Sequence, residues 1–182
     1  MDNRAGLGGE LRTIISAEQI AKRVRELARQ ISSDYRGKTL VVVCTMYNGF
    51  IFMADLVREL ELPVVCQFIR PDFTDRGHTT EIFFSPEPVV KEADVLLLEG
   101  VLDSGVTTEF LTRTLMGLGA ASVKLAVLLD RQSARRVAVH PDYFGFQVDE
   151  AYVVGYGLGS NQLGRNLPYL ATVAKAAQPQ EV

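Results

Sequence analysis

The sequence predicts an α/β protein with a mostly parallel central sheet flanked by helices. Two observations lead to this fold class: apolar runs of strand length alternate with amphipathic helical segments, and these runs are apolar at nearly every position. Strands of that kind are buried on both faces. A length of 182 residues is typical of one domain. We therefore expect a single domain over residues 1–182, with mobile ends at 1–10 and 174–182.

The first half of the chain alternates between helix and strand. A helix is expected to begin after Ser16, because Gln19 stands three residues later, as in a capping box. Apolar side chains then recur on one helical face at Ile20, Val24, Leu27 and Ile31. The apolar run 40–44 predicts a buried strand, a four-residue apolar repeat predicts a helix over 50–60, and 64–69 is predicted as the next strand.

A polar segment then interrupts the pattern at residues 71–80. In a compact domain, an interruption of this length indicates a binding loop or flap. The remaining predicted elements are strands at 81–85, 95–98, 123–129, 144–146 and 152–154, and a helix over 108–118 that Gly119 closes.

The composition excludes several function classes. Nineteen basic and 22 acidic residues give a net charge of −3, which argues against a broad nucleic-acid surface but not against a local phosphate site. Two cysteines and two histidines cannot build a disulfide scaffold or a Cys/His metal cage. The N-terminus lacks a signal-peptide pattern, and no apolar run approaches the ~20 residues of a membrane span. We expect a cytoplasmic protein with no membrane or nucleic-acid partner.

The segment 99–108, which follows the strand at 95–98, carries the clearest chemical signal. Gly105 allows close approach of a ligand to the backbone, and the helix that follows offers N–H groups without internal partners. Hydroxyl donors are provided by Ser104, Thr107 and Thr108. Together these groups suit a phosphate.

Two carboxylates, Glu99 and Asp103, stand beside this phosphate-binding pattern. Carboxylates repel phosphate, so their natural partners are sugar hydroxyls, a metal ion or a proton to be removed. The same residue types also occur in ordinary turns and helix caps, so the pattern alone leaves a structural reading open. A P-loop is absent from the sequence, and the glycines at 155–159 match a dinucleotide fingerprint only superficially.

These motifs resemble those of the hypoxanthine–guanine type of purine phosphoribosyltransferase, over about residues 11–173. The string Glu99-Gly100-Val101-Leu102-Asp103-Ser104-Gly105-Val106-Thr107 is similar to the family's motif for phosphoribosyl diphosphate (PRPP). Further similar strings stand at 49–56, 128–131, 153–158 and 165–169. The resemblance implies a type I phosphoribosyltransferase fold with a small hood and a flexible flap at 71–80.

The resemblance also implies an activity in purine salvage: transfer of ribose 5-phosphate from PRPP to hypoxanthine or guanine, with release of pyrophosphate and with Mg²⁺ as cofactor. Asp103 would be the catalytic residue that accepts the purine's proton. PRPP and its 5-phosphate would contact Glu99, Asp103, Ser104, Gly105, Val106 and Thr107. The purine would contact Arg131, Tyr152 and Val153, and the pyrophosphate would contact Arg165. Without the resemblance, Tyr152 could be a plain strand aromatic and Arg165 a solvated surface charge.

The chain departs from the family pattern at several site positions. Gly100 replaces the second acidic residue, Gly159 replaces a metal-binding Asp, and Arg131 replaces a lysine. Met46-Tyr47-Asn48 lacks the lysine of the pyrophosphate loop, and the flap's Ser-Tyr pair is not recognisable at 72–74. With no metal ligand at Gly159, Mg²⁺ would be held mainly by PRPP and water.

These departures leave two functions open. The first is an active purine phosphoribosyltransferase, and the second is a catalytically impaired relative that binds a purine nucleotide or PRPP as a sensor or regulatory partner. An unrelated flavodoxin-like domain is a weaker third reading. A homodimer or homotetramer is expected from the resemblance alone.

Overall fold

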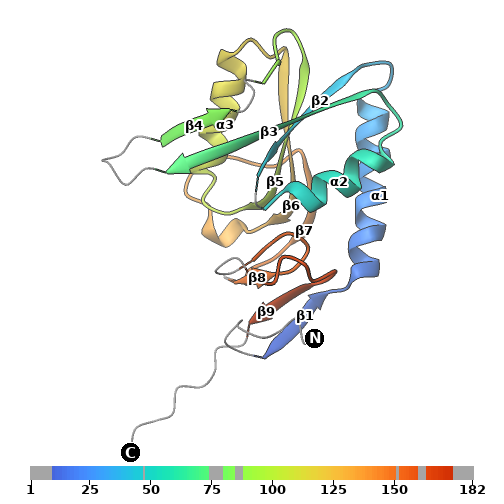
Figure 1. Cartoon of the computed structure of the whole chain (residues 1–182), viewed down its shortest axis with the longest axis vertical. Helices are drawn as coiled ribbons and strands as arrows, with labels where there is room; N and C mark the ends of the chain where they lie inside the picture. The colour runs from blue at the N-terminus through green and yellow to red at the C-terminus, as the bar shows by residue number, and fades with distance from the viewer. Residues whose placement is uncertain are drawn as a thin grey trace, which may run out of the picture.

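The computed structural model describes residues 10–46, 48–73, 80–84, 88–150, 152–159 and 163–173. Within these ranges the chain forms a six-stranded sheet and a separate three-stranded sheet (Figure 1). In chain order the elements are β1 (Leu11–Ile15), α1 (Ala17–Asp34), β2 (Leu40–Thr45), α2 (Phe50–Glu59), β3 (Val64–Phe73), β4 (Thr80–Phe84), β5 (Asp94–Leu102), α3 (Val106–Gly117), β6 (Ser122–Asp130), a 3₁₀ turn (Gln132–Ala134), β7 (Tyr143–Gln147), β8 (Val153–Val154) and β9 (Leu170–Val173).

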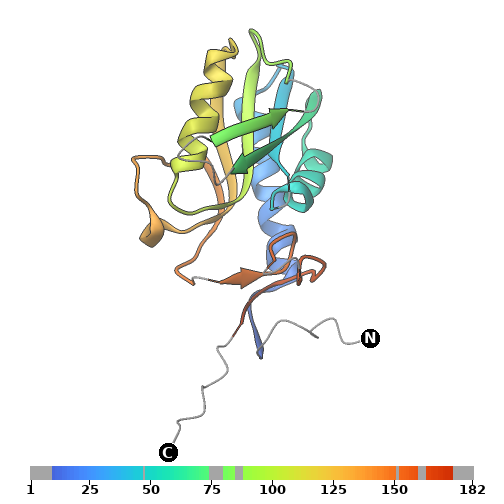
Figure 2. The ribbon, with the colours of Figure 1, turned by 60° about the vertical axis from the view of Figure 1, so that its left-hand side comes forward.

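The larger sheet confirms the predicted fold class. Its strand order is β4-β3-β2-β5-β6-β7, and every neighbouring pair is parallel except the antiparallel pair β3–β4. Helices α1 and α2 pack on one face and α3 on the other, so α3 and α1 lie on opposite sides of the sheet in Figure 2. Every residue of β2 is buried, as its continuous apolar run predicts.

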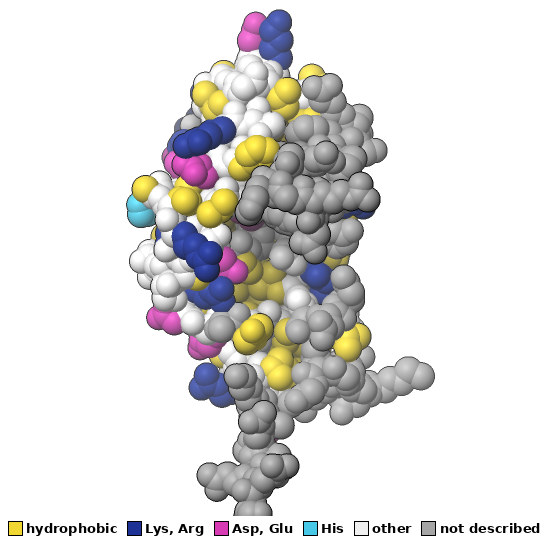
Figure 3. Space-filling model, turned by 90° about the vertical axis from the view of Figure 1, so that its left-hand side faces the viewer, with side chains coloured by type: hydrophobic (Ala, Val, Ile, Leu, Met, Phe, Trp, Pro, Cys, Tyr) yellow, Lys and Arg dark blue, Asp and Glu magenta, His cyan; other side chains and the backbone are white. Residues whose placement is uncertain are grey.

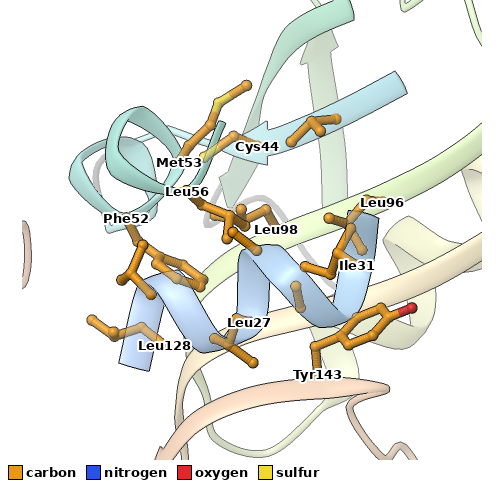
Figure 4. Close-up of a cluster of buried hydrophobic side chains, with 14 of the residues drawn as sticks. Leu27, Ile31, Cys44, Phe52, Met53, Leu56, Leu96, Leu98, Leu128 and Tyr143 are labelled. Atoms are coloured by element: carbon orange, nitrogen blue, oxygen red, sulfur yellow. The ribbon is translucent and has the colours of Figure 1, made fainter. Parts of the chain in front are cut away.

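The core beneath α1 and α2 is made by the residues that the helical periodicity singled out. Leu27 and Ile31 of α1 and Phe52 of α2 point into it, against Leu96 and Leu98 of β5 (Figure 4). Helix α1 begins with the expected capping box, because the Gln19 amide donates to Ser16 Oγ at 3.3 Å and the Ser16 amide donates to Gln19 Oε1 at 2.8 Å.

Three predicted boundaries near the carboxyl ends of these strands were wrong. Strand β5 continues four residues past Leu98, so Glu99 lies in a strand rather than in a loop. Helix α3 begins at Val106 instead of 108. The polar segment at 71–80 is shortened from both sides, because β3 runs to Phe73 and β4 begins at Thr80. Pairing with a neighbouring strand extends each of these strands beyond its apolar run.

The remainder of the predicted flap, 74–79, lies outside the described residues, as do residues 1–9 of the predicted mobile end 1–10, the predicted mobile end 174–182 and the departure at position 47.

The smaller sheet joins the two ends of the described chain. Its order is β1-β9-β8, both pairs are antiparallel, and Leu11 pairs with Val173. Periodicity predicted β8 but neither β1 nor β9; the resemblance had implied only a small hood. This sheet lies below the larger sheet in Figures 1 and 2, next to the ends of β5 and β6. No helix in the described ranges is both long and apolar enough to span a bilayer.

Candidate functional site

Two adjoining pockets open where the parallel strands of the larger sheet end, as expected for a doubly wound α/β sheet. One has a volume of about 250 Å³ and reaches toward β8, and the other has a volume of about 520 Å³ and reaches toward the start of α3. Asn48, Val101 and Asp103 line both pockets. Figure 3 shows a hollow in this face of the molecule, with hydrophobic side chains on its floor and charged side chains beside it.

The larger pocket contains the predicted phosphate-binding segment. Ser104, Gly105 and Thr107 line it, between the end of β5 and the first turn of α3. Gly105 adopts φ +80°, which permits the sharp turn into the helix. The amide of Val106 donates to Ser104 Oγ at 3.4 Å, and the exposed Val106 side chain does not line the pocket. The structure thus brings three of the four predicted residues at 104–107, namely Ser104, Gly105 and Thr107, to one pocket.

Glu99 lies at the inner wall of the same pocket and is only 6% exposed. Thr108 Oγ1 donates a hydrogen bond to Glu99 Oε2 at 2.6 Å. Burial raises the pKa of Glu99 from 4.5 to about 7, although the bond from Thr108 favours the ionised form. A ligand hydroxyl that donates to this carboxylate would favour the ionised form further.

Asp103 stands at the junction of the two pockets and forms an ion pair that the sequence did not predict. Its Oδ1 lies 2.9 Å from Nε of Arg131, the predicted purine contact. Arg131 also donates from Nη1 to the Glu150 carbonyl at 3.4 Å. The Asp103 side chain is about half exposed, which leaves it accessible from both pockets.

The smaller pocket has mainly apolar walls, including Val101, Leu129 and Leu158. Tyr152 and Val153 line it, and Tyr152 is 69% exposed. The alternative interpretation of Tyr152 as a plain strand aromatic is wrong, because the residue lies just before β8 and not within it. A flat aromatic ligand would fit between such walls.

Arg165 approaches the site indirectly. Its Nη1 donates to Asn48 Oδ1 at 2.8 Å and to the Gly157 carbonyl at 2.6 Å. It contacts the site through Asn48 and lines neither of the two pockets. The alternative interpretation as a solvated surface charge is wrong, because the side chain is partly buried and makes these two hydrogen bonds.

Arg135, which sequence reasoning missed, binds the backbone just before the predicted phosphate-binding segment. Its Nε donates to the Asp103 carbonyl at 2.9 Å and its Nη2 donates to the Leu102 carbonyl at 3.3 Å. The same guanidinium pairs with Asp130, which is 2% exposed at the end of β6. A buried acidic residue at the end of a strand requires a partner. Asp130, at the end of a predicted strand, was therefore the one sign in the sequence that a nearby basic residue such as Arg135 would pair with it.

The described residues do not form a metal cage. In these ranges no three His, Cys, Asp or Glu side chains gather closely enough to hold a metal ion. At Gly159, a Cβ atom would lie 2.6 Å from the Leu163 carbonyl oxygen and 2.7 Å from Arg165 Cγ. An acidic side chain does not fit at this position without displacement of its neighbours.

This combination of a doubly wound sheet, a predicted phosphate-binding segment at the start of a helix and an adjoining apolar pocket agrees with the family comparison. The family model described as "Phosphoribosyl transferase domain" matches residues 12–161, and the chain belongs to the phosphoribosyltransferase family. Within that family it falls among the hypoxanthine-guanine phosphoribosyltransferases, as its relatives and structural neighbours show.

Three comparisons show how similar the chain is to members of this group. The hypoxanthine-guanine phosphoribosyltransferase of Bacillus subtilis is 32% identical over 171 residues, which cover 91% of this chain and 94% of the relative. The hypoxanthine phosphoribosyltransferase of Haemophilus influenzae is 35% identical over 167 residues, with 88% and 93% covered. A crystal structure of a hypoxanthine-guanine phosphoribosyltransferase from Bacillus anthracis has a TM-score of 0.85 at 32% identity and covers 91% of this chain and 99% of its own.

Proposed function

We propose that the protein is a purine phosphoribosyltransferase that transfers ribose 5-phosphate from PRPP to hypoxanthine or guanine and releases pyrophosphate. One observation carries the proposal: an apolar pocket beside Tyr152 and a phosphate-binding pocket beside Ser104 meet at Asp103. A purine and a ribose phosphate placed in these pockets would have their reacting atoms near that carboxylate. The names of the relatives support the same substrates.

In the proposed reaction, a purine ring nitrogen forms a bond to C1 of the ribose while the bond from C1 to the diphosphate oxygen breaks. Asp103 accepts the proton that the purine loses, and Arg131 holds this carboxylate through the 2.9 Å ion pair. The backbone and hydroxyls of residues 104–107 bind the 5-phosphate, and Glu99 accepts hydrogen bonds from ribose hydroxyls. Tyr152 stacks on the base, and the Val153 backbone contacts its edge.

The proposed cofactor is Mg²⁺ bound to PRPP, with oxygens of the substrate and water as its main ligands. Gly159 offers no side-chain oxygen to the ion, and in the described ranges no three His, Cys, Asp or Glu side chains gather closely enough to hold one, which supports this assignment. When bound, the ion would neutralise charge on the departing diphosphate. The protein's contribution is then to position the ribose and the base around it.

We further propose a cytoplasmic protein whose 182 residues form one domain, with a homodimer or homotetramer as the working assembly. Hydrophobic side chains that are exposed on β3 and α2, namely Val65, Phe68 and Phe50, support self-association. Light scattering after gel filtration would test the oligomeric state.

The activity test measures nucleotide formation from PRPP and hypoxanthine or guanine in the presence of Mg²⁺, together with calorimetry of inosine monophosphate binding. We expect turnover. Binding without turnover, for every purine tried, would contradict the proposal and favour the nucleotide-sensor alternative.

The phosphate pocket has its own test. The double variant Ser104→Ala, Thr107→Ala should bind inosine monophosphate more weakly, because it lacks two hydroxyls that line the pocket. Thr114→Ala removes a hydroxyl from the other end of α3 and serves as the control. Unchanged affinity in the double variant would place the phosphate elsewhere.

A further inference from the structure

Tyr156 adopts a backbone conformation that its side chain disfavours. Its φ is +48°, and in the described ranges Glu92 is the only other non-glycine residue with a positive φ. Tyr156 and Gly157 are the central residues of a tight turn, which two backbone hydrogen bonds of 2.9 Å between Gly155 and Leu158 close. Turns with two positive φ values normally use glycine, asparagine or aspartate. A tyrosine at the first central position is strained, so the surrounding structure must hold it there.

A hydrogen bond to helix α2 holds the Tyr156 side chain. The residue is only 7% exposed, and its hydroxyl donates to Asp55 Oδ2 at 2.5 Å. Burial raises the pKa of Tyr156 and the Asp55 carboxylate raises it further, so the hydroxyl keeps its proton and remains a donor at neutral pH. Asp55 also pairs with Arg58 of the same helix, which orients the carboxylate. The bond thus joins the strained turn to an element 101 positions away in the sequence.

The turn that this bond holds forms part of the wall of the smaller pocket. Leu158 lines this pocket, as do Val153 and Val154 just before the turn. Gly157 lies against α2, because a Cβ atom at this position would be 3.5 Å from Ile51 Cβ. The position of the turn relative to α2 therefore sets the position of the Leu158 side chain, and with it the width of the space for a flat ligand.

We propose that Tyr156 is a positioning residue for the base: its hydrogen bond to Asp55 holds the turn 155–158 against α2 and keeps Leu158 at the wall of the smaller pocket. The proposal rests on the proposed function, because it takes this pocket as the site of the purine. Tyr156 does not line the pocket itself and acts through Leu158. None of the residues 152–159 lines the larger pocket, so the effect should be confined to the base.

Tyr156→Phe is the decisive variant, because it removes the hydroxyl and keeps the ring. The KM for hypoxanthine and the dissociation constant of inosine monophosphate should each rise by about fivefold or more, while the KM for PRPP stays unchanged. A general loss of stability would not produce this difference between the two substrates.

Tyr143→Phe is the matched control. Tyr143 is 2% exposed, donates to Asp34 Oδ2 at 2.6 Å and lines neither pocket. Its variant should lower the melting temperature and leave both KM values unchanged. An unchanged KM for hypoxanthine in Tyr156→Phe, or the same rise in both variants, would refute the positioning role.

Asp55 tests the same bond from its other end. Asp55→Asn keeps an oxygen that can accept from Tyr156 and should retain most of the affinity for hypoxanthine, whereas Asp55→Ala should raise the KM as Tyr156→Phe does. Combining Asp55→Ala with Tyr156→Phe should add little to either single variant, because both remove one bond. Additive effects of the two substitutions would overturn the proposal.

The outcomes separate this proposal from the proposed function. If the wild-type protein forms no nucleotide, the proposed function fails, and calorimetry of inosine monophosphate then decides the positioning role alone. Equal affinity of the wild type and Tyr156→Phe for this nucleotide refutes that role. A wild type that binds no inosine monophosphate refutes both proposals.

Discussion

The buried carboxylate of Glu99 should make folding stability depend on pH near neutrality. Burial raises the pKa of Glu99 from 4.5 to about 7 in the folded protein. As the pH rises from about 4.5 to about 7, the unfolded chain releases this proton and the folded protein keeps it. The contribution of Glu99 to stability is therefore fully present at low pH and is lost as the pH rises through the folded pKa.

The substitution Glu99→Gln removes this titration and keeps a side-chain oxygen that can accept from Thr108. A shift of this size corresponds to about 3 kcal/mol, so the variant should gain about 1.4 kcal/mol relative to the wild type for each pH unit between 5 and 7. Above pH 7 the difference between the two proteins should level off. Urea unfolding of both proteins at pH 5, 6, 7 and 8 measures this difference in unfolding free energy.

Thr108→Val is a second variant that tests the cause of the raised pKa of Glu99. Because the Thr108 hydroxyl donates to Glu99 at 2.6 Å, its loss should raise the pKa of Glu99 further and move the plateau to higher pH. A difference in unfolding free energy between the wild type and Glu99→Gln that stays constant from pH 5 to 8 would refute the reasoning.

Three further predictions concern the site. Asp103→Asn should abolish nucleotide formation, since the amide cannot accept the purine's proton; turnover at the wild-type rate would exclude Asp103 as the base. Arg135→Met should reduce the unfolding free energy by about 3–5 kcal/mol, because it removes the cation that pairs with buried Asp130 and leaves a hydrogen bond from Gln132, whereas Arg136→Met on an exposed side chain should change it by less than about 0.5 kcal/mol. Tyr152→Ala should raise the KM for hypoxanthine through the loss of about 1–3 kcal/mol of stacking, with no change in melting temperature; a lower melting temperature and an unchanged KM would mean a structural role.

The large sheet was predictable because its strands are defined locally. Residues 40–44 and 95–98 are apolar at every position, and burial on both faces of a sheet requires that composition. The small sheet was not predictable from periodicity. In β1 only Ile15 is fully buried, and β8 has two residues, so neither strand is long or apolar enough to show a pattern. Their pairing depends on β9, a partner from the other end of the chain.

The same distinction between local and distant partners applies to the site. The position of residues 103–107 at the end of a strand and the start of a helix was predictable, because one short stretch of sequence contains the strand end, the glycine turn and the first helical turn. Arg135 contacts Asp103 from 32 positions away, and Arg165 contacts Asn48 across 117 positions. No periodicity connects such pairs, so only the folded chain reveals them.

The position of β9 makes the two pockets depend on different parts of the chain. Val153 and Val154 line the smaller pocket and are paired with Thr172 and Ala171 of β9. The larger pocket is lined by residues between Thr45 and Thr108, which precede both of these strands in the sequence. A protease cut before residue 170 should therefore weaken binding in the smaller pocket more than in the larger one.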